Sequence, residues 1–340
     1  MTCNPPQNAI PFDRGISVRT FLRPLAAHLA NPQVSEIAIV RPGSLFTRER
    51  GAWHPHTCET LTLEHLQALA NALAVYNGQG LAPIMSVILP GGERGQIVQP
   101  PACLDGTLAI NIRKHASTVK TLEELDAESA FEMAQDSTAL LDADGLTPTD
   151  RKLLGLKEAG EISQFLHEAV QARRNIVIGG ATGSGKTTFA RSLIERVPLH
   201  ERLITIEDVH ELHLPNHRNL VPMMYGIAQG RVDPTQCVAA CMRLSPDRIF
   251  LAELRGGEAW EYLTALNTGH PGSITTTHAN SALDTYDRLA LLIKQSPTGG
   301  QLDLEAIRAF LHNTIDIVLH VERFTLREIH YQPRSRLPTG

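Results

Sequence analysis

The chain has 340 residues, 42% of them hydrophobic and 20% charged, and 31 Lys and Arg against 36 Asp and Glu give a formal net charge of −5. This composition excludes disordered and collagen-like proteins, and the negative charge disfavours proteins that wrap duplex DNA. Five scattered cysteines without a Cys-x-x-Cys pair argue against a disulfide scaffold, and the chain contains neither a signal peptide pattern nor an apolar run of 18 residues, so we expect a cytoplasmic protein.

Residues 1–120 are predicted to form a smaller α+β domain. A turn at Pro42-Gly43 leads into a hairpin, and a helix is expected from Leu63, with Thr62 as its cap and Gly78 as its stop. Strands are expected at 35–40, 85–90, 95–100 and 107–114. The composition of this part does not by itself indicate an activity.

Residues 121–160 carry a concentrated negative charge, with 10 Asp and Glu against 3 Lys and Arg. We expect an acidic linker between two domains, partly helical. The alternative interpretation is an ordinary solvated acidic face.

Residues 161–340 are predicted to form a mostly parallel sheet flanked by helices. An amphipathic helix begins at Ile162, and from there apolar strands alternate with helices, which is typical of α/β folds. The strands are expected at 175–180, 202–208, 247–254, 272–278 and 316–324.

The segment 180–187 fits the phosphate-binding pattern G-x-x-x-x-G-K-[ST], between an apolar strand and a helix. Its glycines let backbone N–H groups face phosphate oxygens, Lys186 is able to reach the β- and γ-phosphates, and the Thr187 hydroxyl is able to ligate Mg²⁺. The alternative is a flexible glycine-rich loop. The predicted nucleotide-binding residues here are Gly180, Ala181, Thr182, Gly183, Ser184, Gly185, Lys186, Thr187 and Thr188.

Carboxylates follow two of the predicted strands. Glu253 comes after one apolar run and Glu207-Asp208 after another, where a carboxylate is able to orient the attacking water or hold the metal. We predict Glu207 and Glu253 as catalytic and metal-binding residues. Ala252 stands where many P-loop enzymes carry Asp, so the metal ligand and the base are expected on different strands. The alternative is a pair of surface carboxylates at strand ends.

Two histidines and several arginines are further candidates. His270 and His278 flank one strand, where a neutral imidazole is able to bond to the γ-phosphate; each is otherwise structural. Arg94 and Arg113 lie at strand ends of the first domain and are able to clamp phosphate, or are ordinary surface residues. Arg255, like Arg243, is either a finger or an ion-pair partner of Glu253.

Four segments in this order, GGATGSGKTT, ITIEDVHEL, LSPDRIFLAELRGGEA and TGHPGSITTTHAN, resemble the Walker A, Asp, Walker B and His boxes of the type II/IV secretion ATPase superfamily. In the first domain, SEIAIVRPGSLFTRERGAWH, LPGGERGQIVQPP and INIRK are similar to the hexameric traffic ATPases of type IV secretion and conjugation systems. The resemblance covers about residues 15 to 325. The sequence contains no cysteine-rich zinc insert, which distinguishes it from the type II branch of the superfamily.

This resemblance implies a RecA-like P-loop NTPase domain, a homohexamer, and a Mg²⁺-dependent ATPase that binds ATP between its two domains. It also implies residue roles: phosphate and Mg²⁺ binding for Lys186 and Thr187, the Asp box for Glu207, the Walker B carboxylate for Glu253, the His box for His278 with His270 at its start, and phosphate contacts for Arg94 and Arg113.

The function we predict is an ATP-hydrolysing motor that powers type IV secretion, through substrate export, pilus biogenesis or conjugative DNA transfer, by nucleotide-driven domain closure. Its expected partners are inner-membrane components and other ATPases of the apparatus. We expect a peripheral position at the cytoplasmic face of the inner membrane and no sequence-specific nucleic acid binding. The alternatives are a pilus assembly or retraction ATPase, a RecA-like DNA translocase, and a nucleotide-gated scaffold with little turnover.

Overall fold

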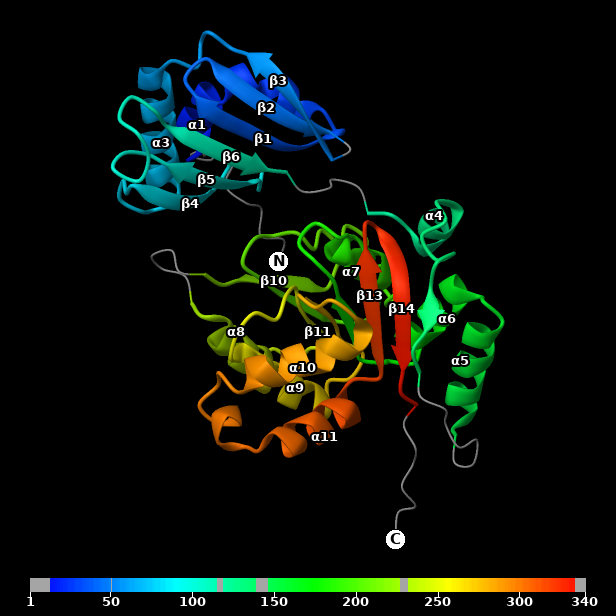
Figure 1. The fold of residues 1–340 in the computed structure, drawn as a ribbon. Helices are drawn as coiled ribbons and strands as arrows, with labels where there is room; N and C mark the ends of the chain where they lie inside the picture. Colours follow the sequence, from blue (N-terminus) through cyan, green and yellow to red (C-terminus); the bar gives the residue numbers. More distant parts are fainter. Residues whose placement is uncertain (1–12, 50, 115–118, 139–145, 227–231, 334–340) are drawn as a thin grey trace, which may run out of the picture. The chain divides into compact units, whose positions relative to one another are not determined.

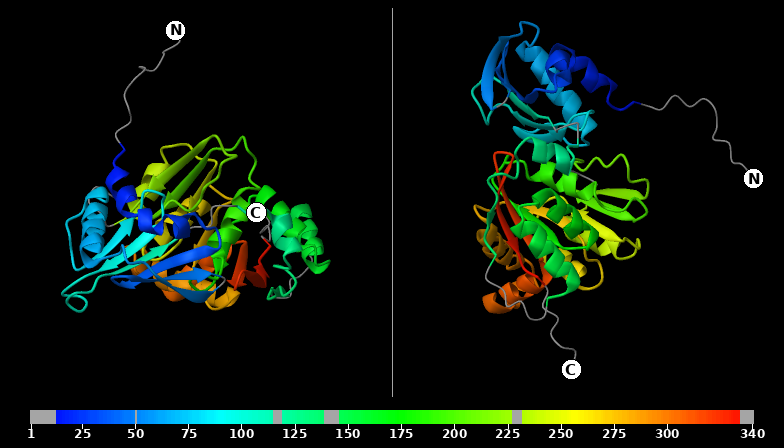
Figure 2. Two further views of the ribbon diagram at one scale, coloured as in Figure 1. Left: turned by 90° about the horizontal axis from the view of Figure 1, so that it is seen from above. Right: turned by 90° about the vertical axis from the view of Figure 1, so that its right-hand side faces the viewer.

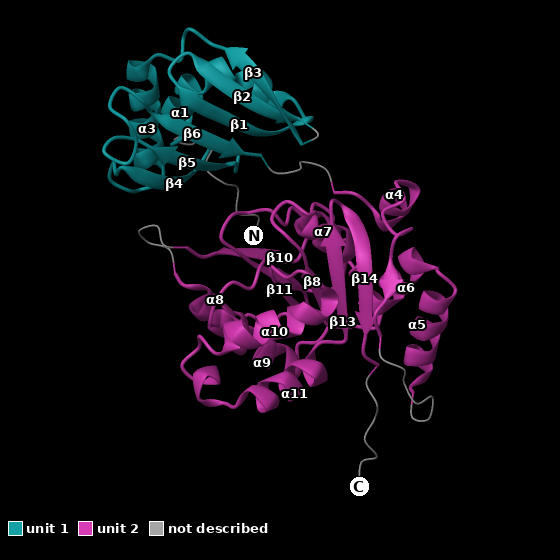
Figure 3. Ribbon diagram, in the orientation of Figure 1, with its two compact units in different colours: residues 1–117, 228–230 teal, residues 118–227, 231–340 magenta. Residues whose placement is uncertain are grey.

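A computed structural model describes residues 13–49, 51–114, 119–138, 146–226 and 232–333. The chain divides into two compact units, residues 1–117 with 228–230 and residues 118–227 with 231–340 (Figure 3). Within the described ranges, no helix is long and apolar enough to cross a membrane.

Unit 1 is an antiparallel sheet with helices against one face (Figure 1). Its strands, in the order β3-β2-β1-β6-β5-β4, are β1 Val34–Arg41, β2 Ser44–Glu49, β3 Ala52–Thr57, β4 Ile84–Ile88, β5 Arg94–Val98 and β6 Ala109–Arg113. Its helices are α1 Ile16–Phe21, η1 Arg23–Leu25, α2 Ala26–Ala30 and α3 Leu63–Tyr76. Alternate residues of β5 and β6 are buried, as expected of a sheet with one covered face.

The local signals of unit 1 are confirmed. Gly43 lies in the turn between β1 and β2 with a φ of 77°, a conformation that glycine adopts without steric cost, and the β2–β3 hairpin follows that turn. The Thr62 hydroxyl accepts a hydrogen bond from the His65 amide at 3.2 Å and caps α3. The helix ends just before Gly78.

Unit 2 has the predicted class of fold, a mostly parallel sheet flanked by helices. Its sheets have the orders β12-β8-β13-β14-β7 and β10-β9-β11. Its strands are β7 Gln135–Asp136, β8 Ile176–Gly179, β9 Leu203–Glu207, β10 Leu220–Met224, β11 Arg248–Leu251, β12 Ile274–Thr277, β13 Ile317–Glu322 and β14 Thr325–Tyr331. Strands β7, β10 and β14 were not predicted.

Threonine hydroxyls join the two sheets of unit 2. Thr275 of β12 donates to the Leu251 carbonyl at 2.6 Å, and Thr276 donates to the Ala252 carbonyl at 2.8 Å. The side chains of β12 therefore satisfy carbonyl groups of β11 that the backbone ladder leaves open. As a result, β11 and β12 lie side by side and end at the same edge.

Helices cover both faces of this sheet (Figure 2, right). On one side are α4 Leu122–Ala127, α5 Pro148–Glu158, α6 Ile162–Gln171 and α7 Lys186–Ile194, and on the other α8 Pro234–Cys241, α9 Glu258–Asn267, α10 Ala282–Ile293, η2 Gly299–Gln301 and α11 Leu304–Thr314. Successive residues of β8 enter different cores, since Ile176 and Ile178 pack on the first side and Val177 on the second. This is why β8 is apolar throughout.

The expected linker at 121–160 differs from the structure, because its described residues pack as part of unit 2. Leu122, Leu125, Phe131 and Leu153 are buried in the first core, together with Phe165. The acidic residues of α4 face outward, while Thr121 and Glu124 form a capping box at its start. The excess of acidic residues in this segment therefore reflects its exposed face, whereas its few apolar residues determine where it packs.

A buried polar cluster also fixes α5 to the sheet. Asp150 is fully buried and accepts hydrogen bonds from Arg174 and from the Tyr331 hydroxyl, the latter at 2.6 Å. Asp316 lies 3.5 Å from the same guanidinium. The cluster joins α5 to the segment before β8 and to β14.

Candidate functional site

The glycine-rich loop lies between β8 and α7, as predicted. Gly185 precedes α7 with a φ of 106°, and a Cβ there would lie 2.8 Å from the ring of Phe324. A Cβ on Gly180 would lie 2.4 Å from the Val321 carbonyl. Only glycine fits at these two positions, which keep the loop close to the sheet and to the N-terminal end of α7. Backbone N–H groups and the helix dipole make such an end suitable for an anion.

Lys186, the first residue of α7, is buried beneath the loop. Its ammonium donates hydrogen bonds to the Gly180 and Ala181 carbonyls, each at 2.8 Å. The same nitrogen lies 3.3 Å from Nδ1 of His278. The loop thus holds one cation in a fixed position at its centre.

The rest of the predicted loop has two kinds of environment. Ala181, Thr182 and Gly183 are exposed, and Ser184 is buried. Thr187 and Thr188 are half-buried in the first turn of α7. The exposed residues therefore form the rim of the loop, and the threonines lie at the helix end.

Glu253 and His278 come together beside Lys186. Nε2 of His278 lies 2.7 Å from Oε1 of Glu253, and Nδ1 faces Lys186. Oε2 of Glu253 accepts two hydrogen bonds from Arg255, at 2.9 and 2.6 Å. A continuous series of polar contacts, called the polar chain below, thus joins residues that follow β8, β11 and β12.

In this structure Arg255 is the ion-pair partner of Glu253, which is one of the two expected roles; the other was an arginine finger that contacts phosphate. Arg255 also contacts Asp208, which becomes part of the site. Its guanidinium donates to Asp208 Oδ2 at 2.7 Å while it holds Glu253. Burial lowers the pKa of Arg255, but Asp208 and Glu253 raise it by more, so the net shift is upward and the cation is secure. Arg243 is exposed after α8.

Glu207 is directed away from this chain of residues. It is fully buried, and its Oε2 accepts hydrogen bonds from the Glu211 and Leu212 amides, each at 2.7 Å. Its Oε1 accepts from the Thr205 hydroxyl at 2.9 Å and lies 3.0 Å from His210. Glu207 therefore organises the turn that follows β9, whereas Asp208 contacts Arg255, the ion-pair partner of Glu253. The Glu207-Asp208 doublet was visible in the sequence, but the orientation of its two side chains was not.

His270 lies at the opposite edge of the sheet. Thr277 pairs with Gly179 in the parallel β12–β8 register, so His278 follows at the edge where the glycine-rich loop begins. His270 precedes β12, with roughly 13 Å of strand between the two ends. Its Nδ1 lies 3.3 Å from the Pro246 carbonyl, before β11. The structure does not bring His270 to the loop.

Arg94 and Arg113 are neighbours in unit 1. They are directly paired in the antiparallel β5–β6 register, at the start of one strand and the end of the other. Arg113 is also directly paired with Glu36 of β1, so a carboxylate lies opposite one of these two like charges in the sheet. The sequence placed both at strand ends but did not show that they pair.

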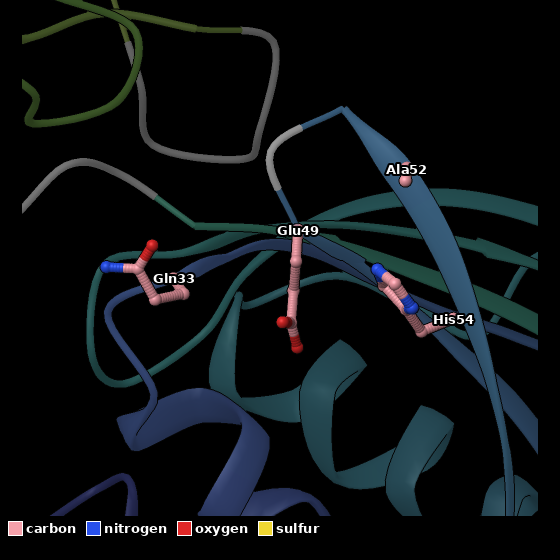
Figure 4. A pocket seen from close by; sticks show the side chains of 4 residues that line it. All are labelled: Gln33, Glu49, Ala52 and His54. Carbon is pink, nitrogen blue, oxygen red and sulfur yellow. The ribbon is translucent and has the colours of Figure 1, made fainter.

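A depression of about 360 Å³ in unit 1 is lined by Gln33, Glu49, Ala52 and His54 (Figure 4). None of the predicted site residues lines it. Among the residues the structure describes, no group of three or more His, Cys, Asp or Glu side chains is placed to hold a metal ion. We assign no function to this depression.

Comparison with known proteins shows the family that this chain resembles. Residues 140–320 match the family model described as "Type II/IV secretion system protein". The type IV secretion system protein VirB11 of Brucella suis is 41% identical over 338 residues, covering 95% of this chain and 92% of the relative. The PtlH homologue of Bordetella bronchiseptica is 41% identical over 318 residues, covering 92% of each.

Solved structures show the same likeness. The crystal structure of the VirB11 ATPase from the Brucella suis type IV secretion system, in complex with sulphate, has 41% identity and a TM-score of 0.52, covering 94% of this chain and 95% of that one. The pilus retraction motor PilT with bound ADP has a TM-score of 0.60 at 20% identity, covering 92% and 83%, which is a likeness of fold alone.

Proposed function

The chain belongs to the type II/IV secretion system protein family, and from this premise we propose that it is the ATP-hydrolysing motor of a type IV secretion system. The relatives at 41% identity are type IV secretion proteins, which favours secretion over pilus retraction. The observation that carries the proposal is the polar chain Glu253–His278–Lys186, which converges on a glycine-rich loop of the right shape.

ATP is held by the loop in this proposal. The rim residues and the first turn of α7 offer N–H groups to the phosphates, and the Lys186 ammonium turns from the loop carbonyls to phosphate oxygens. A Mg²⁺ ion neutralises charge on the β- and γ-phosphates when it is bound. The Thr187 hydroxyl fits as its ligand, with Glu253 or Asp208 behind it. Glu207 does not fit, because it is fully buried and is bound to the Glu211 and Leu212 amides of its own turn.

Glu253 is the proposed general base. Arg255 holds Oε2, and His278 Nε2 lies 2.7 Å from Oε1, so Oε1 is able to accept a proton from the attacking water once the imidazole moves away from it. Arg255 fixes the carboxylate through Oε2. His278 contacts both the base and Lys186. Its two hydrogen bonds are therefore able to change when the γ-phosphate leaves.

Unit 1 is proposed to close on the nucleotide. Arg94 and Arg113 lie opposite one another in the sheet, and two guanidinium groups bind phosphate oxygens more strongly than one group does. ATP would favour the closed state and its hydrolysis would release it, because a ligand shifts a conformational equilibrium only by its differential affinity. We place this cycle in a homohexamer of RecA-like domains.

The same proposal covers location and partners. The motor acts at the cytoplasmic face of the inner membrane through peripheral contact, with inner-membrane components and other ATPases of the apparatus as its partners. It does not read nucleic acid sequence.

The steady-state ATP hydrolysis rate tests this function. We expect turnover by the full chain that Lys186→Ala abolishes, that single-stranded DNA does not change, and that anionic vesicles alter. Strong stimulation by DNA would instead support a translocase, and absence of turnover in all conditions would support a scaffold.

A further inference from the structure

The turn between β13 and β14 has an unusual backbone. Glu322 pairs with Thr325, so the hairpin connection is only Arg323-Phe324. Both residues have positive φ, 50° and 61°, as the favoured two-residue turn requires. Asn and Gly usually fill such positions, and Phe there is strained. Local sequence preference therefore does not explain why Phe324 is at this turn.

Phe324 is attached to the glycine-rich loop. Its amide donates a hydrogen bond to the Ser184 carbonyl at 2.7 Å, and its ring faces the Cα of Gly185. The residue is nevertheless 55% exposed. A large aromatic side chain is thus held by its backbone beside the loop, with much of its surface open to solvent.

The parallel register places this turn at the edge where phosphates are expected. His320 of β13 pairs with Gly179, the last residue of β8, and β13 continues to Glu322, so its turn lies just beyond the start of the glycine-rich loop. The proposed base and its histidine lie on the other side of β8, after β11 and β12. The γ-phosphate belongs on that side. The nucleoside end must then leave the loop in the opposite direction, toward β13.

We propose that Phe324 is the stacking platform for the base of the bound nucleotide. The inference rests on the proposed ATP site, and it adds the residue that holds the end of the nucleotide that the loop does not hold. A ring face interacts with any base, and no base edge is read by it, so the platform contributes affinity for nucleoside triphosphates in general.

The test compares two ligands that share their phosphates. Binding of the non-hydrolysable analogue AMP-PNP and of inorganic tripolyphosphate is measured with Mg²⁺ by calorimetry on the full chain. Phe324→Gly removes the ring, and glycine accepts the positive φ of this turn without strain. We expect it to weaken AMP-PNP about tenfold and to leave tripolyphosphate unchanged. Arg323→Asn, also tolerant of positive φ, is the matched control and should change neither affinity.

A second variant gives a signal that does not depend on loss of binding. Phe324→Trp keeps an aromatic face, so we expect near-normal affinity and a change in its fluorescence with AMP-PNP but not with tripolyphosphate. Unchanged AMP-PNP affinity in Phe324→Gly, equal loss for both ligands, or no fluorescence response would overturn the proposal. Failure of the ATP site itself would appear differently, as binding of both ligands that Lys186→Ala does not reduce.

Discussion

Two adjacent carboxylates, Glu207 and Asp208, have different partners in this structure. Glu207 accepts two backbone amides of its own turn, and Asp208 pairs with Arg255 beside Glu253. The catalytic and metal-binding role that the sequence predicts for Glu207 is therefore better assigned to Asp208. Substituting Glu207 and Asp208 one at a time separates a role in folding from a role in catalysis.

We predict that Glu207→Gln costs about 1–3 kcal/mol of unfolding free energy, because its new NH₂ group leaves a buried amide without an acceptor. Asp208→Asn should change stability by less than about 1 kcal/mol and lower ATP turnover. Urea unfolding and steady-state hydrolysis measure the two effects, with the exposed Glu305→Gln as control. The opposite pattern, a stable but inactive Glu207→Gln, would return the catalytic role to Glu207.

His210 makes part of the stability of this turn depend on pH. A hydrogen bond to Glu207 raises its pKa above the ordinary 6.5, so the folded state favours the charged ring. Its contribution is full below pH 6.5 and is lost as pH rises through the elevated pKa. Because the side chain is 37% exposed, we expect less than about 1 kcal/mol. The stability gap between wild type and His210→Gln should be larger at pH 6 than at pH 8.5 in urea unfolding, and a constant gap would contradict this.

At this scale the sequence identified residues but not their orientations. Lys186, Glu253 and His278 were predicted because a spaced motif and the ends of parallel strands bring them to one edge. His270 was assigned to the site because it flanks the same strand, and a strand has two ends. Asp208 and Glu207 follow one another, so only side-chain direction distinguishes them.

At the scale of elements, the packing of α5 depends on one buried carboxylate. Asp150 is the partner of Arg174, Tyr331 and the Thr147 hydroxyl. We predict that Asp150→Ala lowers the free energy of unfolding by about 3–5 kcal/mol, because it leaves a buried guanidinium without its closest anion. Chemical denaturation of the full chain measures this. Glu158→Ala, at an exposed position of the same helix, should have little effect, and equal effects of both would contradict the role of the cluster.

Sequence signals predicted most strands of both units, together with the helices α3, α6 and α7. The segments 95–100 and 107–114 were expected to be strands and contain β5 and β6, apolar runs indicated β8, β9, β11 and β12, and Thr62 indicated the start of α3. The segment 121–160 was harder, because its charges outnumber its buried residues although the buried ones decide its packing. The β13–β14 hairpin was missed because Arg323-Phe324 does not resemble a turn.

At the scale of the whole molecule, the proposed ATPase cycle depends on coupling between the two units. Arg113→Ala removes one of the two paired guanidinium groups, and we predict weaker ATP binding and slower turnover by at least about tenfold, with unfolding free energy nearly unchanged because the side chain is exposed. Nucleotide titration and hydrolysis assays check this. Wild-type binding and turnover in Arg113→Ala would contradict closure of unit 1 on the phosphates.

The most direct test of the central claim is Glu253→Gln, measured for ATP hydrolysis and nucleotide binding together. We predict that turnover falls at least about a hundredfold while nucleotide affinity stays within about threefold of wild type, because the amide keeps the shape but not the basicity of the carboxylate. Turnover at the wild-type rate would contradict the assignment of Glu253 as base, and secretion supported by an inactive Glu253→Gln would contradict the motor itself.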